Sequence, residues 1–311
     1  MKTKIWIALV ALYIVWGSTY LAIRFAVETI PPFFQAGLRF LIAGVILFIW
    51  RRLAGDALPT RNQWKSAAII GSLLLGGNGL VSWAEQTIPS GVAALIIGAV
   101  PMFLVIAEAF RRGGVKPTWR VVIGLLIGFT GIYLLVGPSE FSGGMKLNPF
   151  GVAALLSASF LWALGSIYSK NADLPSSALM LTGAEMLMGS LSLFVVSLAT
   201  GELRGFSFSH ISTNSWLGLA YLITVGSMIG FVSYAWLLQN APISLVATYA
   251  YVNPLVAVLL GAVFLHEELT VRILAASVII IGSVIFINSG NRPRVQKEAK
   301  IGDQLSVISD Q

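Results

Sequence analysis

Long apolar segments alternate with short polar ones along almost the whole chain of 311 residues. A helix that spans a membrane needs roughly 20 consecutive, mostly apolar residues. Ten segments have this character. The pattern therefore predicts an all-α polytopic membrane protein with ten transmembrane helices, at residues 5–24, 33–50, 64–84, 90–110, 119–137, 149–169, 177–199, 215–238, 243–265 and 271–289.

The apolar segments repeat after the fifth. Polar and aromatic positions of the first span recur in the sixth at a constant offset, and the fourth and ninth spans share a pair of prolines twelve residues apart. This predicts one five-helix unit at 1–137, a linker at 138–148, a second unit at 149–290 and a disordered cytoplasmic tail at 291–311. Because five is odd, the second unit enters the membrane from the opposite side, which predicts inverted repeats.

Charge predicts the orientation. The chain is 57% hydrophobic and 11% charged, with a net charge of +7. The loops at 51–65 and 111–120 are strongly basic, whereas their counterparts at 200–214 and 266–272 carry one basic residue each. By the positive-inside rule, both termini are cytoplasmic. The Lys and Arg residues are distributed among loops and do not form a basic patch on one soluble face, which argues against a nucleic-acid partner.

The first apolar segment follows Lys2 and Lys4, so it also fits a secretory signal peptide. Its copy in the sixth span favours a retained first helix. The composition, with a mean hydropathy of +0.85, leaves too little polar surface for a soluble fold of this size. The lipid bilayer is therefore an expected partner, and the inner membrane is the expected location.

Polar and aromatic side chains form stripes at helical spacing on several spans. Polar groups are costly in hydrocarbon unless they face protein or a wet cavity. Small residues in such stripes also serve close helix packing, which is the simpler interpretation of any single one. Stripes on several helices together favour a substrate cavity, for which the candidate residues are Trp16, Asn78, Trp162, Tyr234, Tyr249 and Asn253.

Five charged residues lie within or beside predicted spans. Arg24, Arg39 and Glu85 map to the outer third of the membrane, and Lys170 and Glu185 to the inner third. One interpretation is structural or gating ion pairs within each group. The other is that Glu85 or Glu185 binds substrate or a coupling proton.

Pro101 and Pro254 lie in the middle of the fourth and ninth spans. A proline there removes a backbone hydrogen bond and bends the helix. A static bend and a hinge are both open interpretations.

Catalytic and metal-binding signatures are missing from the sequence. There are no cysteines, and GxSxG, HExxH and GxxxxGK[ST] do not occur. We therefore expect no enzyme activity, no cofactor and no metal.

Four motifs carry a resemblance to a known family: WGSTYLAIR in the first span, LRFLIAG in the second, AEQTIPSGVAALIIGAVP across the third and fourth, and FLHEELT before the tenth. Over residues 4–290 the chain resembles an EamA-type member of the drug/metabolite transporter superfamily. The resemblance implies an inner-membrane carrier that exports small metabolites, often amino acids or drug-like compounds. It also implies a cavity lined by the first, third, fourth, sixth, eighth and ninth helices, with the fourth and ninth acting in gating. The chain departs from symmetry at Glu85, whose counterpart is Trp236 or Leu238.

These observations predict a secondary transporter that exports amino acids or related compounds by alternating access, with protons as a possible coupling ion. The alternative is a lipid flippase or a non-transporting accessory subunit in the membrane.

Overall fold

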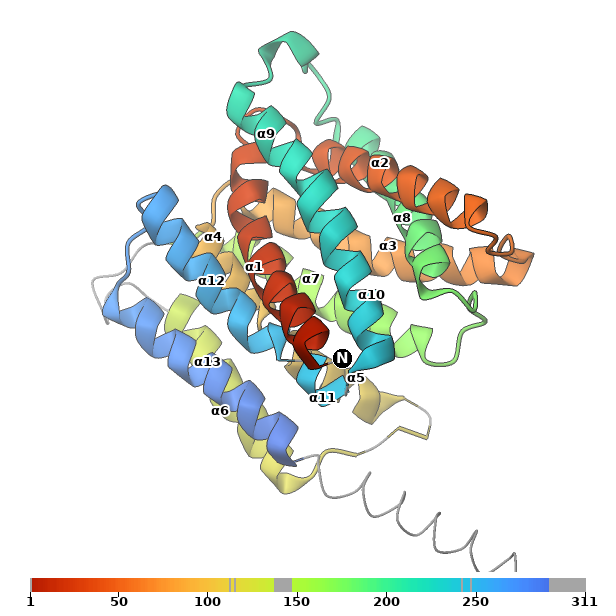
Figure 1. Ribbon diagram of the computed structural model, residues 1–311. Coiled ribbons are helices and arrows are strands. Elements are labelled where there is room, and N and C mark those ends of the chain that lie inside the picture. Colours follow the sequence, from red (N-terminus) through yellow and green to blue (C-terminus); the bar gives the residue numbers. More distant parts are fainter. Residues whose placement is uncertain are drawn as a thin grey trace, which may run out of the picture.

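The structure is a computed structural model that describes residues 2–111, 113–114, 116–136, 147–241, 243–246 and 248–290. Every regular element within these ranges is a helix (Figure 1). The helices are α1 (Lys2–Ala26), α2 (Pro32–Leu53), α3 (Arg61–Ala84), α4 (Ser90–Ile97), α5 (Val100–Phe110), α6 (Trp119–Val136), α7 (Pro149–Ser169), α8 (Ala178–Thr200), η2 (Phe208–His210), α9 (Thr213–Tyr221), η3 (Leu222–Ile229), α10 (Gly230–Asn240), α11 (Ile243–Val246), α12 (Tyr249–Phe264) and α13 (Val271–Gly290).

The described helices have the lengths that a polytopic membrane protein needs. Eight segments are long and apolar enough to cross a membrane, and Tyr249–Phe264 and Val271–Ile287 are shorter apolar helices. In the fourth apolar segment, α4 and α5 together span Ser90–Phe110. The predicted tail at 291–311 and most of the predicted linker at 138–148 lie outside the described residues.

Polar residues at the helix ends explain where several helices begin. Thr60 accepts a hydrogen bond from the backbone nitrogen of Gln63, whose side chain accepts one from Thr60 in return, which is a capping box. The side chain of Asn148 caps α7 through Phe150, directly before Pro149. Such caps satisfy backbone groups that the first helical turn leaves unpaired.

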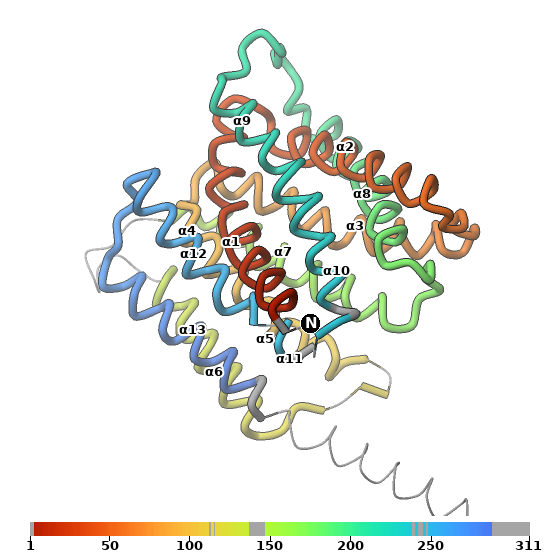
Figure 2. Tube along the Cα trace, viewed as in Figure 1, coloured from red at the N-terminus to blue at the C-terminus, as the bar shows by residue number. Residues whose placement is uncertain are grey.

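The helices pack in pairs that join distant parts of the sequence. The main pairs are α2 with α8, α3 with α7 and with α8, α6 with α13, α12 with α1 and with α4, and α1 with the rod made by α9, η3 and α10. Figure 1 shows α6 and α13 side by side, and it shows α1 between α12 and the rod. The tube in Figure 2 follows the same path and shows that α9, η3 and α10 continue one another.

Hydrogen bonds join the loops at each end of the bundle. At one end, Glu202 accepts from the backbone nitrogens of Phe33 (3.3 Å) and Phe34 (2.7 Å), and Glu267 accepts from Ser90. At the other end, the amide of Gln63 donates to Asp173 (3.3 Å) and to the carbonyl of Leu174 (3.2 Å). We call the first the Glu267 end and the second, where Lys170 lies three residues before Asp173, the Lys170 end.

Candidate functional site

Four aromatic rings form a cluster where α1 meets α10 and α12. The ring centroid of Trp16 lies 5.3 Å from that of Phe231, 5.1 Å from Tyr234 and 5.1 Å from Tyr249. Tyr234 and Tyr249 are 5.8 Å apart, nearly perpendicular. These spacings are those of attractive aromatic pairs. The structure therefore brings three of the predicted substrate residues together, and it adds Phe231.

Asn253 lies beside this cluster on α12. With its amide nitrogen turned toward them, it donates to the carbonyl oxygens of Tyr13 (3.3 Å) and Tyr249 (3.1 Å). The hydroxyl of Tyr13 in turn shares a hydrogen bond with that of Thr248. A polar network thus joins α1 to the start of α12 next to the aromatic cluster.

Gly230 allows Trp16 to lie against the rod. A Cβ atom at position 230 would come within 2.4 Å of the indole nitrogen of Trp16, so any larger residue would displace the ring. The close approach of α1 and α10 therefore depends on this glycine.

The other two predicted substrate residues lie on the packed pair α3 and α7. The amide of Asn78 donates to the carbonyl of Leu74 in its own helix at 3.2 Å. Trp162, on α7, is half-buried. Among the described residues, no hydrogen bond or ring contact joins either side chain to the aromatic cluster.

Glu85 is enclosed at the Glu267 end, directly after α3. Its side chain is 0% exposed, and neither carboxylate oxygen has a hydrogen-bond partner among the described residues. Arg24 donates to the backbone carbonyl of Glu85, and the charges of Glu267 and Arg24 act on the carboxyl with opposite signs. An enclosed carboxylate without hydrogen bonds is costly, so the protonated form is favoured in this arrangement.

Arg39 and Glu185 do not form ion pairs with the described residues, although one interpretation of the sequence is ion pairing within the outer and the inner group of charges. Arg39 is 4% exposed and donates from Nε to the hydroxyl of Ser227 at 2.9 Å. Glu185, on α8, forms no ion pair with the described residues. These two residues occupy equivalent positions in the predicted repeat.

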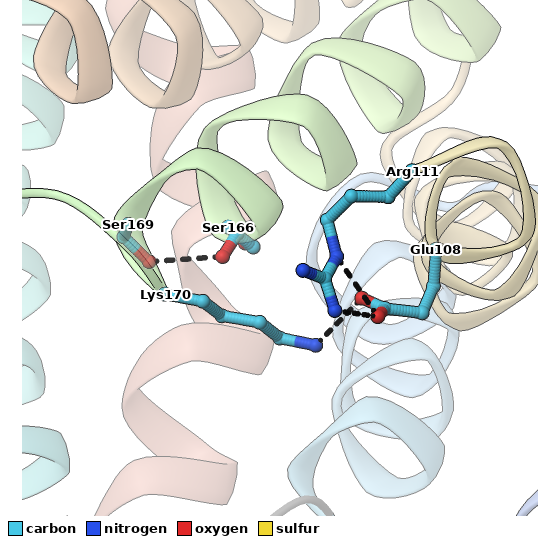
Figure 3. Close-up of polar contacts among 5 residues, drawn as sticks. All are labelled: Glu108, Arg111, Ser166, Ser169 and Lys170. Carbon is cyan, nitrogen blue, oxygen red and sulfur yellow. Dashed lines mark hydrogen bonds and ion pairs between the residues drawn. The ribbon is translucent and has the colours of Figure 1, made fainter. Parts of the chain in front are cut away.

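Lys170 forms an ion pair at the opposite end of the bundle. Its Nζ lies 2.9 Å from Oε2 of Glu108, whose other oxygen binds Arg111 at 2.5 Å (Figure 3). Lys170 follows α7, whereas Glu108 and Arg111 come from the end of α5. The pair therefore holds α5 against α7. The predicted ion-pair candidate Lys170 thus pairs with Glu108, which was not among the candidates.

The fourth and ninth apolar segments cross at a close contact. α4 ends at Ile97 and α5 begins at Val100, so the interruption lies just before Pro101, which stands in the first turn of the new helix. Pro254 lies within the continuous helix α12. A Cβ at Gly98 would lie 3.3 Å from Cγ of Pro254. The break in the fourth segment therefore touches the proline of the ninth.

A carboxylate from the loop before α13 binds the start of α4. Glu267 accepts hydrogen bonds from the backbone nitrogen (2.7 Å) and hydroxyl (2.8 Å) of Ser90 and from the backbone nitrogen of Gly91 (3.0 Å). A negative charge at a helix N-terminus is stabilised by the free N–H groups and the helix dipole. Sequence reasoning missed this residue, although it lies within the FLHEELT motif.

Comparisons with known proteins agree on the kind of protein. The sequence profile of the EamA-like transporter family matches residues 3–137 and 149–289. YedA of Escherichia coli strain K12, described as an uncharacterized inner membrane transporter, is 41% identical over 282 residues, which are 89% of each chain. YvbV of Bacillus subtilis strain 168, described as an uncharacterized transporter, is 26% identical over 306 residues, 97% of this chain and 96% of that one.

A solved crystal structure with 21% identity superimposes with a TM-score of 0.60, covering 91% of this chain and 96% of the other. This likeness shows a common fold. The family profile and the names of the relatives indicate a multi-pass inner membrane transporter rather than an enzyme.

Proposed function

The chain belongs to the EamA-like transporter family, and on that premise we propose that it is a secondary transporter that exports small metabolites by alternating access. Amino acids and related or drug-like compounds are the proposed substrate class. In this proposal ten helices cross the inner membrane as two inverted five-helix repeats, residues 1–137 and 149–290, with both termini in the cytoplasm. The basic loops at 51–65 and 111–120 then lie at the cytoplasmic, Lys170 end.

The observation that supports this proposal is a difference in helix packing between the two ends of the bundle, on either side of the contact between Gly98 and Pro254. Toward the Glu267 end, α4 packs against α12. In an inverted repeat the equivalent pair toward the Lys170 end is α5 with α11. Among the described residues these two helices make no comparable contact.

At the Lys170 end, α5 and α11 instead pack against other neighbours. Glu108 holds α5 to α7, while Val246 of α11 belongs to an apolar cluster with Leu9, Leu12 and Leu237 of α1 and α10. Closer packing of the fourth and ninth apolar segments at one end than at the other fits one of the two states that alternating access requires. We therefore propose that this conformation is closed to the outside and faces the cytoplasm.

The substrate site in this proposal lies at the aromatic cluster. Trp16, Tyr234 and Tyr249 come from helices in both halves of the chain, and Asn253 adds a polar group. An apolar surface with a few fixed polar groups is typical of small-molecule sites. Asn78 and Trp162 are proposed to face the same space from α3 and α7 in another step of the cycle.

Glu85 is the proposed coupling residue. Its carboxyl is fully enclosed at the closed end, where Arg24 donates to its backbone carbonyl. Opening that end would expose the carboxyl to water and allow it to ionise. Proton exchange with the outside would then accompany opening.

The test is transport in proteoliposomes that contain the purified protein and a panel of labelled amino acids and drug-like amines. Directional movement of at least one solute, faster with an imposed pH gradient, is expected. Failure to move any small solute would reject the proposal. Flipping of fluorescent lipid analogues without solute movement would favour a flippase instead.

A further inference from the structure

Arg39 is a buried cation without an acidic partner. It lies on α2 with 4% of its surface exposed, and its guanidinium carbon is 4.6 Å from the centre of the Phe40 ring. The hydroxyl of Ser227 accepts its Nε hydrogen at 2.9 Å. None of the acidic side chains in the described part of the chain lies within 4.0 Å.

The two terminal nitrogens of Arg39 remain available. A guanidinium offers five N–H donors, and here only Nε is bonded to a described residue. Neither terminal nitrogen is among the fully enclosed polar atoms, so each keeps some accessible surface despite the burial of the residue. One serine and one ring are weak compensation for a buried charge. The terminal nitrogens of this buried cation are therefore in position to donate hydrogen bonds to an anion.

The helix that faces Arg39 is irregular at this point. Ser227 and Gly226 lie in η3, a π-helix of eight residues, and such segments are frequent at functional sites. A Cβ at position 226 would lie 3.3 Å from Nη2 of Arg39 and 3.0 Å from Cγ2 of Thr19. Glycine at this position therefore allows the rod to approach the guanidinium and α1 closely.

The same rod connects Arg39 to the aromatic cluster. Phe231 lies one helical turn after Ser227. It packs against the apolar cluster that contains Phe40, and its ring also contacts Trp16. The cation and the rings thus lie near one another, between α1, α2 and the rod.

We propose that Arg39 binds a carboxylate group of the transported solute, while the apolar body of the solute lies against Trp16, Phe231 and Tyr234. Arginine holds a carboxylate through two parallel N–H···O bonds, for which the terminal nitrogens are free. This inference rests on the proposed transport function and assigns the solute class to organic carboxylates.

The first test is ligand-dependent thermal unfolding of the purified full-length protein. The probes are benzoate, 4-hydroxybenzoate and 3-phenylpropionate, each beside its uncharged amide. At least one acid should raise the unfolding midpoint of the wild type in a saturable way, and its amide should not. Stabilisation by none of the acids, or equal stabilisation by acid and amide, would overturn the proposal.

Variants then locate the effect. Arg39→Gln should weaken binding of the acid at least tenfold, whereas Arg39→Lys should retain part of it because lysine keeps the charge but not the planar fork. Arg120→Gln is the matched control, since Arg120 is exposed and also lies beside a ring, that of Trp119, at 5.6 Å. Unchanged binding in a folded Arg39→Gln protein would assign Arg39 to structure alone.

If Arg39→Gln does not fold, Ser227→Ala provides the second variant. It keeps the cation and removes the bond that orients it, so the acid should bind several-fold more weakly. Wild-type affinity in both Ser227→Ala and Arg39→Lys would overturn the proposal.

Transport assays separate this inference from the proposed function. Movement of amines or neutral solutes, but of no carboxylate, would leave the transporter intact and reject the role of Arg39. Movement of no solute of any class would reject the transport function itself.

Discussion

The carboxylate of Glu267 accepts hydrogen bonds from both the backbone nitrogen and the hydroxyl of Ser90, at 2.7 and 2.8 Å. The two residues belong to different halves of the chain, and their contact ties the start of α4 to the loop after α12. This contact joins the two gating segments at the end that we propose faces outward.

Glu267→Gln should therefore open the outer end. Hydrogen bonds to a charged group contribute about 1.5–3 kcal/mol, so the neutral amide should raise the open population roughly tenfold or more. The chain has no cysteines, so Val258→Cys, at a buried position on α12, gives a single reporter. Its labelling by an impermeant maleimide from outside should accelerate. Glu268→Gln, at the exposed neighbouring position, is the control, and equal rates in both variants would contradict the role of Glu267.

Glu85→Gln should remove the dependence of transport on the pH gradient. The amide mimics the protonated carboxyl that the enclosed site favours, so the variant should still fold and exchange solute. Uptake rates with and without an imposed gradient give the measurement. A gradient response like that of the wild type would reject the coupling role of Glu85.

Gly71 should not tolerate a side chain. A Cβ there would lie 2.3 Å from the carbonyl oxygen of Glu185, which is backbone and has little freedom to move. Overpacking of this kind costs about 1–3 kcal/mol, so Gly71→Ala should lower the thermal unfolding midpoint by several degrees. Gly76→Ala in the same helix meets nothing within 4 Å and should leave it almost unchanged. Equal midpoints would contradict the close packing of α3 and α8.

The hydrogen bonds of Asp56, in the loop after α2, should make the stability of the protein depend on pH. Two hydrogen bonds from Arg51, at 2.9 and 2.8 Å, and a further one from Ser177 lower the pKa of Asp56 from its ordinary 3.8 to about 2. Because the folded-state pKa lies below the unfolded one, this contact stabilises the protein above about pH 4, and the contribution is lost as the pH falls to about 2. Asp56→Asn should flatten the fall of the unfolding midpoint in this window. An identical slope in both proteins would contradict the assignment.

The apolar segments could be predicted from the sequence, because helical spacing and burial are local properties. The contact of Trp16 with Tyr234 and Tyr249 depends on how α1, α10 and α12 pack, which the local pattern does not determine. The partner of Lys170 was not predictable, since reaching Glu108 depends on how the end of α5 leans toward α7. Pro101 predicts a bend in the fourth span, and the helix is interrupted at Gly98 and Ala99, just before that proline. Proline fits the first turn of a helix as well as it bends one, so Pro101 alone does not locate the interruption.

The central claim is that the two ends of the crossing at Gly98 and Pro254 open alternately. Pulsed electron paramagnetic resonance tests it with spin labels on two pairs of exposed positions, Gln86 with Phe264 at the Glu267 end and Phe110 with Asn240 at the Lys170 end. In Glu267→Gln, relative to the wild type, we predict longer distances for the first pair together with shorter distances for the second. A longer first distance with an unchanged second distance would contradict alternating access.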